Sequence, residues 1–202
     1  MRTKILYLFI AVLMLFSISA CAGQGTNGSG TGSGSTNLTG SALDVLSKLD
    51  EDLQQTGIQM PMTLPPTDVS PDMSQNDIGL STADFNSLVT SAASSLAAIG
   101  TFAHQIAVIQ ANDAAAATQV KSLISGTGGY DAQKWICVWP EKVIVVESGA
   151  YVLLAAAHAD VVDAAVEAFR NEAGSIGTVV TFFEHDGSAE PPVGGGEPIA
   201  LG

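Results

Sequence analysis

Basic residues are scarce in this sequence, and their scarcity restricts the partners that the chain can bind. Seven of the 202 residues are Lys or Arg, whereas twenty are Asp or Glu, so the formal net charge is −13 at pH 7. Nucleic acids and anionic lipid headgroups are held by clustered Lys and Arg side chains. The composition therefore argues against both partners and is typical of an acidic, well-solvated surface.

Cysteine is also scarce, and Cys21 and Cys137 are the two cysteines of the chain. Because Cys21 is assigned to lipid below, Cys137 is left without a partner within the chain. This excludes a scaffold stabilised by disulfide bonds. Cys137 lies in the apolar segment 135–139, which predicts a buried, unreactive thiol.

Catalytic motifs are missing as well. The sequence contains no Ser nucleophile elbow, no pair of catalytic carboxylates and no zinc-ligand spacing. The glycine-rich segment 125–129 invites comparison with a phosphate-binding loop, but it follows a predicted helix, and no Gly-Lys-Ser/Thr comes after it. We therefore interpret it as an ordinary loop, and we expect no cofactor.

The start of the chain carries the most specific signal. Arg2 and Lys4 precede an apolar run over residues 5–18, which has the pattern of a secretory signal peptide and is shorter than the roughly 20 residues that span a bilayer. Small residues then lead to Cys21, an arrangement that resembles the lipobox of bacterial lipoproteins. The sequence predicts cleavage after residue 20 and acylation of Cys21, with palmitate among its acyl chains. An ordinary signal peptide with an incidental cysteine, or an uncleaved anchor, is the alternative.

The segment after Cys21 is predicted to be a flexible tether. Residues 22–40 are almost entirely Gly, Ser, Thr and Asn, and they cannot bury enough apolar area to offset their conformational entropy. A coil of this length reaches about 25 Å. Five basic residues remain after the predicted cleavage, against twenty acidic ones, which gives the mature chain a net charge of about −15.

The predicted organisation has four parts. A signal peptide over residues 1–20 precedes the lipidated cysteine and linker at 21–40. A single domain follows at 41–183, because that length can bury a sizeable core. Residues 184–202 are rich in Gly, Pro and acidic residues and are predicted to be a disordered tail.

The centre of the domain is predicted to be a hairpin that leads into a helix. Two β-branched and aromatic runs, 143–146 and 151–155, are separated by Ser148-Gly149, which indicates a tight turn. A helix follows from about residue 161, with Asp160 as its cap and Gly174 at its end. Its core face is expected to consist of Val162, Val166, Phe169 and Ala173.

Other elements are predicted from capping residues and periodicity. A helix runs from Ser41 to Gly57, with Asp44 at capping-box spacing. Four prolines argue against regular structure in 56–79. The remaining expectations are a helical turn at 80–85 capped by Ser81 or Thr82, an element at 87–99 that is either strand or helix, a strand at 101–110, a helix capped by Asn112 or Asp113 with Ala116, Val120, Leu123 and Ile124 on its core face, and a last strand at 178–183. Together they predict an α+β fold, with a mostly antiparallel sheet of about four or five strands and helices packed on one face.

Three residues at the junction between strand and helix are the main candidates for chemistry. His158, Asp160 and Asp163 could bind a divalent cation or act as acid and base. Alternatively, Asp160 caps the helix, Asp163 stabilises its N-terminus and His158 is a solvated loop residue. We favour the capping interpretation and assign no metal site.

Further polar and sulfur-containing residues have less support as sites. Glu184, His185 and Asp186 form a second metal-like cluster, but it borders the predicted tail and lacks a rigid surrounding. His104 alternates with apolar residues on a predicted strand, which indicates a hydrogen-bonded core histidine. The methionines at 60, 62 and 73 are predicted to fill gaps at the core, and a copper(I) site is the alternative.

Several segments together resemble a family of bacterial lipoproteins catalogued as domain of unknown function 4358. The segments are 60–62, which follows the Leu-rich opening helix, 78–80, 105–109, 141–145, 149–154 and 165–169. The resemblance covers about residues 42–170. It implies an exported lipoprotein with no assigned activity and no known catalytic residues.

Two classes of function remain. The chain is expected to be extracytoplasmic and lipid-anchored to the bacterial cell membrane, as a binding or accessory module that recognises an envelope protein, a peptide or a cell-wall component. The alternative is a metal-assisted envelope enzyme that uses His158, Asp160 and Asp163.

Overall fold

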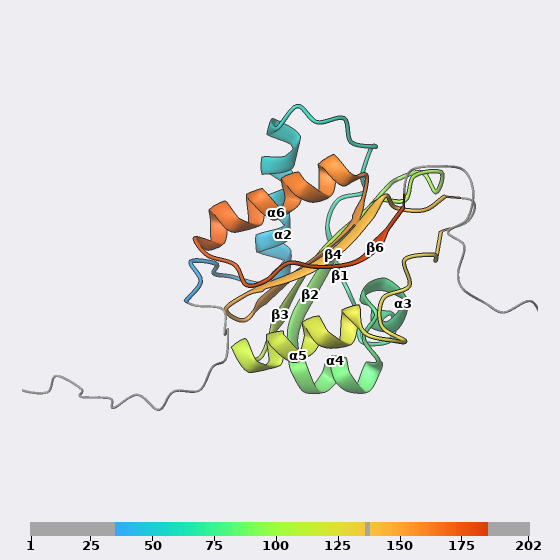
Figure 1. Ribbon diagram of the computed structural model, residues 1–202. Helices are drawn as coiled ribbons and strands as arrows, with labels where there is room; N and C mark the ends of the chain where they lie inside the picture. Colours follow the sequence, from blue (N-terminus) through green and yellow to red (C-terminus); the bar gives the residue numbers. More distant parts are fainter. Residues whose placement is uncertain (1–34, 136–137, 186–202) are drawn as a thin grey trace, which may run out of the picture. The chain divides into compact units, whose positions relative to one another are not determined.

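The computed structural model describes residues 35–135 and 138–185 (Figure 1). The predicted signal peptide, Cys21, Cys137 and Asp186 lie outside these ranges. Within them, no helix is long and apolar enough to cross a membrane. The elements are α2 (Ala42–Gln55), β1 (Thr67–Asp68), α3 (Ser74–Ile78), α4 (Thr82–Leu88), β2 (Val89–Leu96), β3 (Gln105–Ala111), α5 (Ala114–Ser125), β4 (Lys142–Ser148), β5 (Tyr151–Ala157), α6 (Ala159–Ala173) and β6 (Val180–Glu184).

The strands form one antiparallel sheet with the order β1-β2-β3-β5-β4-β6. This confirms the predicted α+β class and the antiparallel sheet. The sheet has six strands where four or five were expected. The additional short strand, β1, pairs at the edge with β2 and lies just after two prolines, at the kind of position where proline is tolerated.

Helices cover both faces of the sheet, whereas the sequence predicted one covered face. One apolar cluster contains Ile106 and Val108 of β3 together with α2 and α6. The other contains Ala107 and Ile109 of the same strand together with α3, α4 and α5 (Figure 1). The reason lies in the central strands, because β4 and β5 are apolar on both sides and leave no polar face for water.

Local capping signals are confirmed at three helices. Ser41 and Asp44 form a complete capping box at the start of α2. Ser81 caps α4, and Asp113 caps α5. Leu123, expected on the core face of α5, is instead an exposed side chain, and Ala117 takes its place in the core.

The ambiguous segment 87–99 contains strand β2. Its Ala, Ser and Leu residues suit a helix by propensity, but the segment pairs with β3 over nearly its whole length. Strand formation depends on such cross-strand partners more than on intrinsic preference. The proline-rich stretch also differs from expectation, because the short helix α3 begins three residues after Pro71.

The central hairpin and its helix follow the prediction with a shifted turn. Ser148 pairs with Tyr151, so Gly149 and Ala150 are the turn residues, and Ser148 belongs to the strand. Gly149 has a φ of +55°, a left-handed value that glycine adopts without strain. The four predicted core residues of α6 are all buried, and Gly174 ends the helix.

The domain extends a few residues beyond both predicted boundaries. Before α2, the Asn37 N–H donates to the Ala173 carbonyl at 2.9 Å, and Leu38 is buried in the core. At the other end, Glu184 pairs with Lys142 in the sheet, and the His185 N–H donates to the Glu141 carbonyl at 2.8 Å. Residues 37–40 and 184–185 therefore belong to the folded domain and not to the predicted linker and tail.

Candidate functional site

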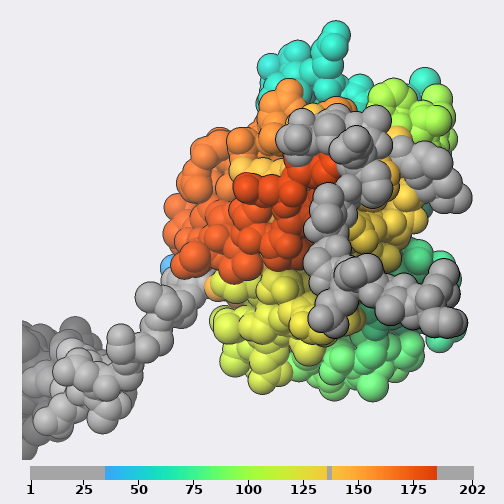
Figure 2. Space-filling model, turned by 45° about the vertical axis from the view of Figure 1, so that its right-hand side comes forward, coloured from blue at the N-terminus to red at the C-terminus, as the bar shows by residue number. Residues whose placement is uncertain are grey.

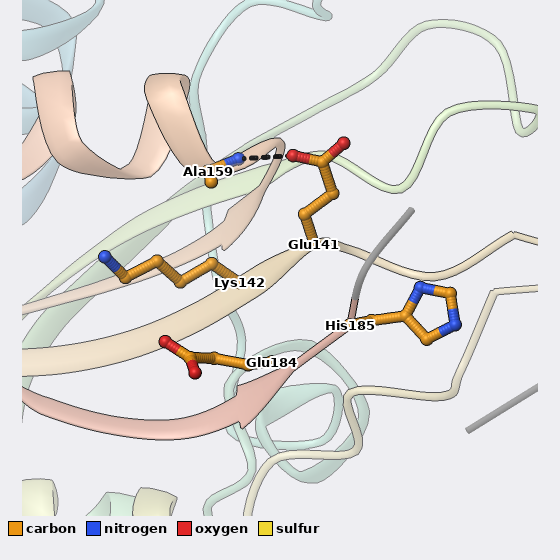
Figure 3. Close-up of a pocket in the computed structure, with 5 residues that line it drawn as sticks. All are labelled: Glu141, Lys142, Ala159, Glu184 and His185. Carbon is orange, nitrogen blue, oxygen red and sulfur yellow. Dashed lines mark hydrogen bonds between the residues drawn. The ribbon is translucent and has the colours of Figure 1, made fainter. Parts of the chain in front are cut away.

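A shallow pocket of about 570 Å³ lies where β4 and α6 begin and β6 ends. Its lining residues are Glu141, Lys142, Ala159, Glu184 and His185 (Figure 3). Glu141 directly precedes β4, and the one-residue connection after β5 brings the start of α6 next to it. Lys142 and Glu184 are paired residues of neighbouring strands, and Figure 3 shows their side chains extending in the same direction.

Glu141 caps helix α6 from outside the helix. Its Oε2 accepts a hydrogen bond from the Ala159 N–H at 3.0 Å, and its Oε1 lies 2.8 Å from Nδ1 of His158. The Ala159 N–H, and then the His158 imidazole, hold the pKa of the Glu141 carboxyl below its usual value. Because this carboxylate occupies the positive end of the helix, that end is already neutralised by the protein itself.

The prediction that Asp160 caps α6 is therefore wrong. Asp160 lies within the first turn of α6, and its Oδ1 accepts from the Val161 N–H at 2.8 Å. The residue that precedes the helix is His158, which makes no side-chain capping hydrogen bond. The actual cap was missed because Glu141 is distant in sequence, whereas capping rules search only the residues next to a helix.

The three candidate ligands are not assembled into a site. His158 contacts Glu141, Asp160 contacts the backbone of its own helix, and Asp163 forms an ion pair with Lys142 at 2.7 Å. Within the described ranges, no three His, Cys, Asp or Glu side chains come close enough to hold a metal ion.

The second cluster is only partly within the described residues. His185 stacks on Phe183 with the ring planes 11° apart and also contacts Trp139, with 5.8 Å between the ring centroids. Its backbone N–H donates to the Glu141 carbonyl, and its imidazole lines the pocket. The pocket thus combines the imidazole of His185 with one lysine and two glutamates, and it can hold a polar ligand through hydrogen bonds.

His104 is buried just before β3, as predicted, but it is not fully hydrogen-bonded. Its Nδ1 has no hydrogen-bond partner in the described parts of the chain. Burial, and secondarily the charge of His158, lowers the pKa of His104 to about 4. The imidazole is consequently neutral at pH 7.

A buried polar network around Lys134 has no counterpart in the sequence prediction. The Lys134 Nζ donates to the Gln105 Oε1 at 2.6 Å and to the carbonyls of Asn76 and Asp77 at 3.1 and 3.2 Å. It also lies 4.5 Å from the centre of the Tyr130 ring. Burial lowers the pKa of Lys134 to about 8.

The same network is completed by side chains of the neighbouring strands β2 and β3. The Tyr130 hydroxyl donates to the Gln105 Oε1 at 2.8 Å, and the Gln105 amide donates to Ser94 at 2.8 Å. These contacts fasten the segment before β4 to α3 and the sheet. No local sequence pattern reveals them, because each pair of partners comes from different parts of the chain.

The structure separates the three methionines that were predicted to fill gaps at the core. Met60 packs against the core, whereas Met62 and Met73 are exposed and do not fill gaps as predicted.

Lys121 of α5 and Glu147 of β4 form a largely buried ion pair. This pair joins a helix to the sheet beneath it and does not line the pocket.

Comparison with known proteins adds no assignment to this site. No family model, curated protein or solved structure matches the chain.

Proposed function

We propose that this chain is an exported bacterial lipoprotein, anchored through Cys21, that serves as a binding or accessory module of the cell envelope. The observation that carries the proposal is the start of the sequence, where a basic and then apolar segment leads to small residues and Cys21. The Gly- and Ser-rich stretch that follows is suited to hold a domain away from a lipid surface. The resemblance to the lipoprotein family supports the same proposal.

The place where the linker joins the domain supports a binding role for the pocket. Thr36 lies so close to Gly149 that a Cβ on the glycine would come within 2.5 Å of the threonine methyl group. The linker therefore reaches the domain at the β4–β5 turn. The pocket lies at the other end of β4, which has seven residues and is about 23 Å long. The attachment of the linker and the pocket therefore lie at opposite ends of β4.

A binding module is preferred to the metal-assisted enzyme. The side chains of His158, Asp160 and Asp163 each have a different partner, and the helix end that could attract an anion is capped by Glu141. The accessible groups of the pocket suit recognition of a polar segment of an envelope protein, a peptide or a cell-wall component.

Labelling with radioactive palmitate tests the proposed anchor. Cells that express the full chain should incorporate label into the protein, and Cys21→Ala should abolish it, because the acyl chains need this residue. Cys137→Ala is the matched control and should retain full labelling. Label that persists in the Cys21→Ala chain would reject the assignment.

A further inference from the structure

Four of the six large apolar side chains that are exposed within the described ranges gather near one end of the sheet. Met62, Leu64, Ile99 and Phe102 are 75%, 51%, 54% and 43% exposed. We refer to these four residues as the apolar edge patch. They carry on the order of 400 Å² of accessible surface, which is the size of the largest apolar patch on a typical monomer.

Backbone contacts place the apolar edge patch at the end of β2. The isolated bridge between Thr63 and Ala97 sets the segment 62–64 beside this end. Ile99 and Phe102 lie in the turn that follows, where the Phe102 N–H donates to the Ile99 carbonyl at 3.3 Å. Figures 1 and 2 show this turn, in yellow-green, at the upper right of the molecule.

The end of β6 lies at the same end of the sheet as the patch. One row of paired residues crosses five strands, and its members are Leu96, Gln105, Ala156, Val143 and Phe183. Leu96 is the last residue of β2, and Phe183 is the last but one of β6. Because neighbouring strands lie about 4.8 Å apart, the four steps from β6 to β2 amount to roughly 19 Å.

The chain beyond β6 contains one uncharged apolar run. Residues 186–202, which lie outside the described ranges, are referred to below as the C-terminal segment. Up to Glu197 this segment consists mostly of Gly, Pro and acidic residues, and the run Pro-Ile-Ala-Leu follows at 198–201. The fourteen residues 186–199 would reach about 21 Å as a coil, which matches the distance from the end of β6 to the end of β2.

We propose that residues 198–201 dock on the apolar edge patch of the same chain. A tethered segment binds most readily when its mean reach equals the span that it must cross, and this condition is met here. The patch has about half of the roughly 800 Å² that each partner of a stable protein complex buries, so its size suits a short segment of the same chain. Docking removes from water an apolar surface that would otherwise favour aggregation.

The distribution of charge favours the same position. The C-terminal segment contains Asp and Glu but no Lys or Arg, so the acidic surface of the domain repels it. Residues 53–67 and 85–112, which form the patch, contain no Asp, Glu, Lys or Arg. Glu141 and His158, which lie before β4 and after β5 on the way from β6 to β2, are paired with each other at 2.8 Å. The apolar run therefore meets no carboxylate of the patch when it docks.

Cysteine crosslinking within the purified full chain tests the contact. In a Cys137→Ser background, Ile99→Cys and Ile199→Cys place one thiol on the patch and one in the docking run. Mild oxidation should join the two peptides within one chain, and mass spectrometry should find a yield that does not depend on protein concentration.

The control pair combines Ile199→Cys with Asp163→Cys. Asp163 is exposed and forms an ion pair with Lys142, which is paired with Glu184, so it lies closer to the start of the C-terminal segment than the patch does. A segment without a docking site should therefore react more with this thiol, whereas docking should favour the Ile99→Cys pair at least tenfold.

Substitutions on both sides of the contact complete the test. Leu201→Asp, which lies outside the folded domain, and Phe102→Asp should each reduce the yield of the Ile99→Cys pair at least tenfold, whereas Phe102→Leu should preserve it. Three results would overturn the proposal. They are a yield no higher than that of the Asp163→Cys control, a yield that Leu201→Asp leaves unchanged, and a disulfide that joins two chains. Because neither thiol involves Cys21, the outcome is independent of the lipid anchor.

Discussion

His104 shows how burial, more than any neighbouring charge, determines the charge of a side chain in this protein. His104 lies in the connection between β2 and β3 and is buried, its Nδ1 lacks a hydrogen-bond partner among the described residues, and His158 lies near enough to oppose its protonation. Because the charged form is the one that burial penalises, the folded chain keeps His104 neutral well below pH 6.5.

We expect His104 to make the folded domain sensitive to acid. Its pKa falls from 6.5 to about 4 on folding. Between these pH values the unfolded chain binds a proton that the folded chain does not, so the free energy of unfolding falls as the pH drops from 6.5 to 4. The loss amounts to roughly 3 kcal/mol.

Urea titrations of wild type and His104→Gln at pH 7, 5.5 and 4 would measure this loss. Gln cannot titrate, so the stability of wild type relative to the variant should decrease by roughly 3 kcal/mol across this range. His158→Gln is the control and should keep most of the dependence, because burial is the larger cause of the shift. A stability difference that does not change with pH would contradict the expectation.

At the scale of elements, α6 depends on the sheet in two ways. Glu141, which precedes β4, supplies the hydrogen bond that caps the helix. The apolar face of α6 covers β4 and β5, and Phe169 is among its fully buried side chains. Helix and hairpin therefore stabilise each other, and the hairpin is not an independent unit.

Replacing Phe169 should be much more costly than replacing a residue on the outer face of α6. Phe169→Ala leaves a cavity between helix and sheet and should lower the free energy of unfolding by about 3–5 kcal/mol. Glu167→Ala should change it by less than about 0.5 kcal/mol, because this side chain is exposed and its ion pair with Arg170 lies on the surface. Urea titration of both variants would measure these free energies of unfolding. Equal stability of Phe169→Ala and wild type would contradict the observed packing.

At the scale of the whole domain, its ends contribute to stability. Asn37 and Leu38 bind the end of α6 and the core, and Glu184 and His185 extend β6 alongside the start of β4. These contacts lie outside the predicted limits of 41–183. They place the attachment of the linker at one end of the sheet and the pocket at the other.

A fragment that spans residues 35–185 should therefore be more stable than one that spans 41–183. The shorter fragment loses the buried Leu38 and two backbone hydrogen bonds, which should lower its Tm by several degrees, at about 2–4 °C per kcal/mol for a domain of this size. Dithiothreitol should leave the Tm of both fragments unchanged, because no disulfide pair is expected. Calorimetry would measure both effects, and identical Tm values would show that the end segments contribute nothing.

Local signals in the sequence determined much of the fold. The capping box of Ser41 and Asp44, the caps Ser81 and Asp113, and the apolar face of α6 all involve residues within one or two turns of each other. The antiparallel hairpin of β4 and β5 could also be predicted from the sequence, because its turn glycine lies between two β-branched runs. The sequence alone also carries the prediction of lipidation at Cys21.

Only the tertiary structure decided the features that depend on distant partners. Segment 87–99 became strand β2 because β3 pairs with it, and Glu141 replaced Asp160 as the cap of α6 because the sheet brings it there. The Lys134 network and the separation of His158, Asp160 and Asp163 likewise follow from contacts between segments far apart in the chain. Periodicity and capping rules describe interactions between near neighbours, whereas the pocket is formed where β4 pairs with β6 and the start of α6 lies next to them.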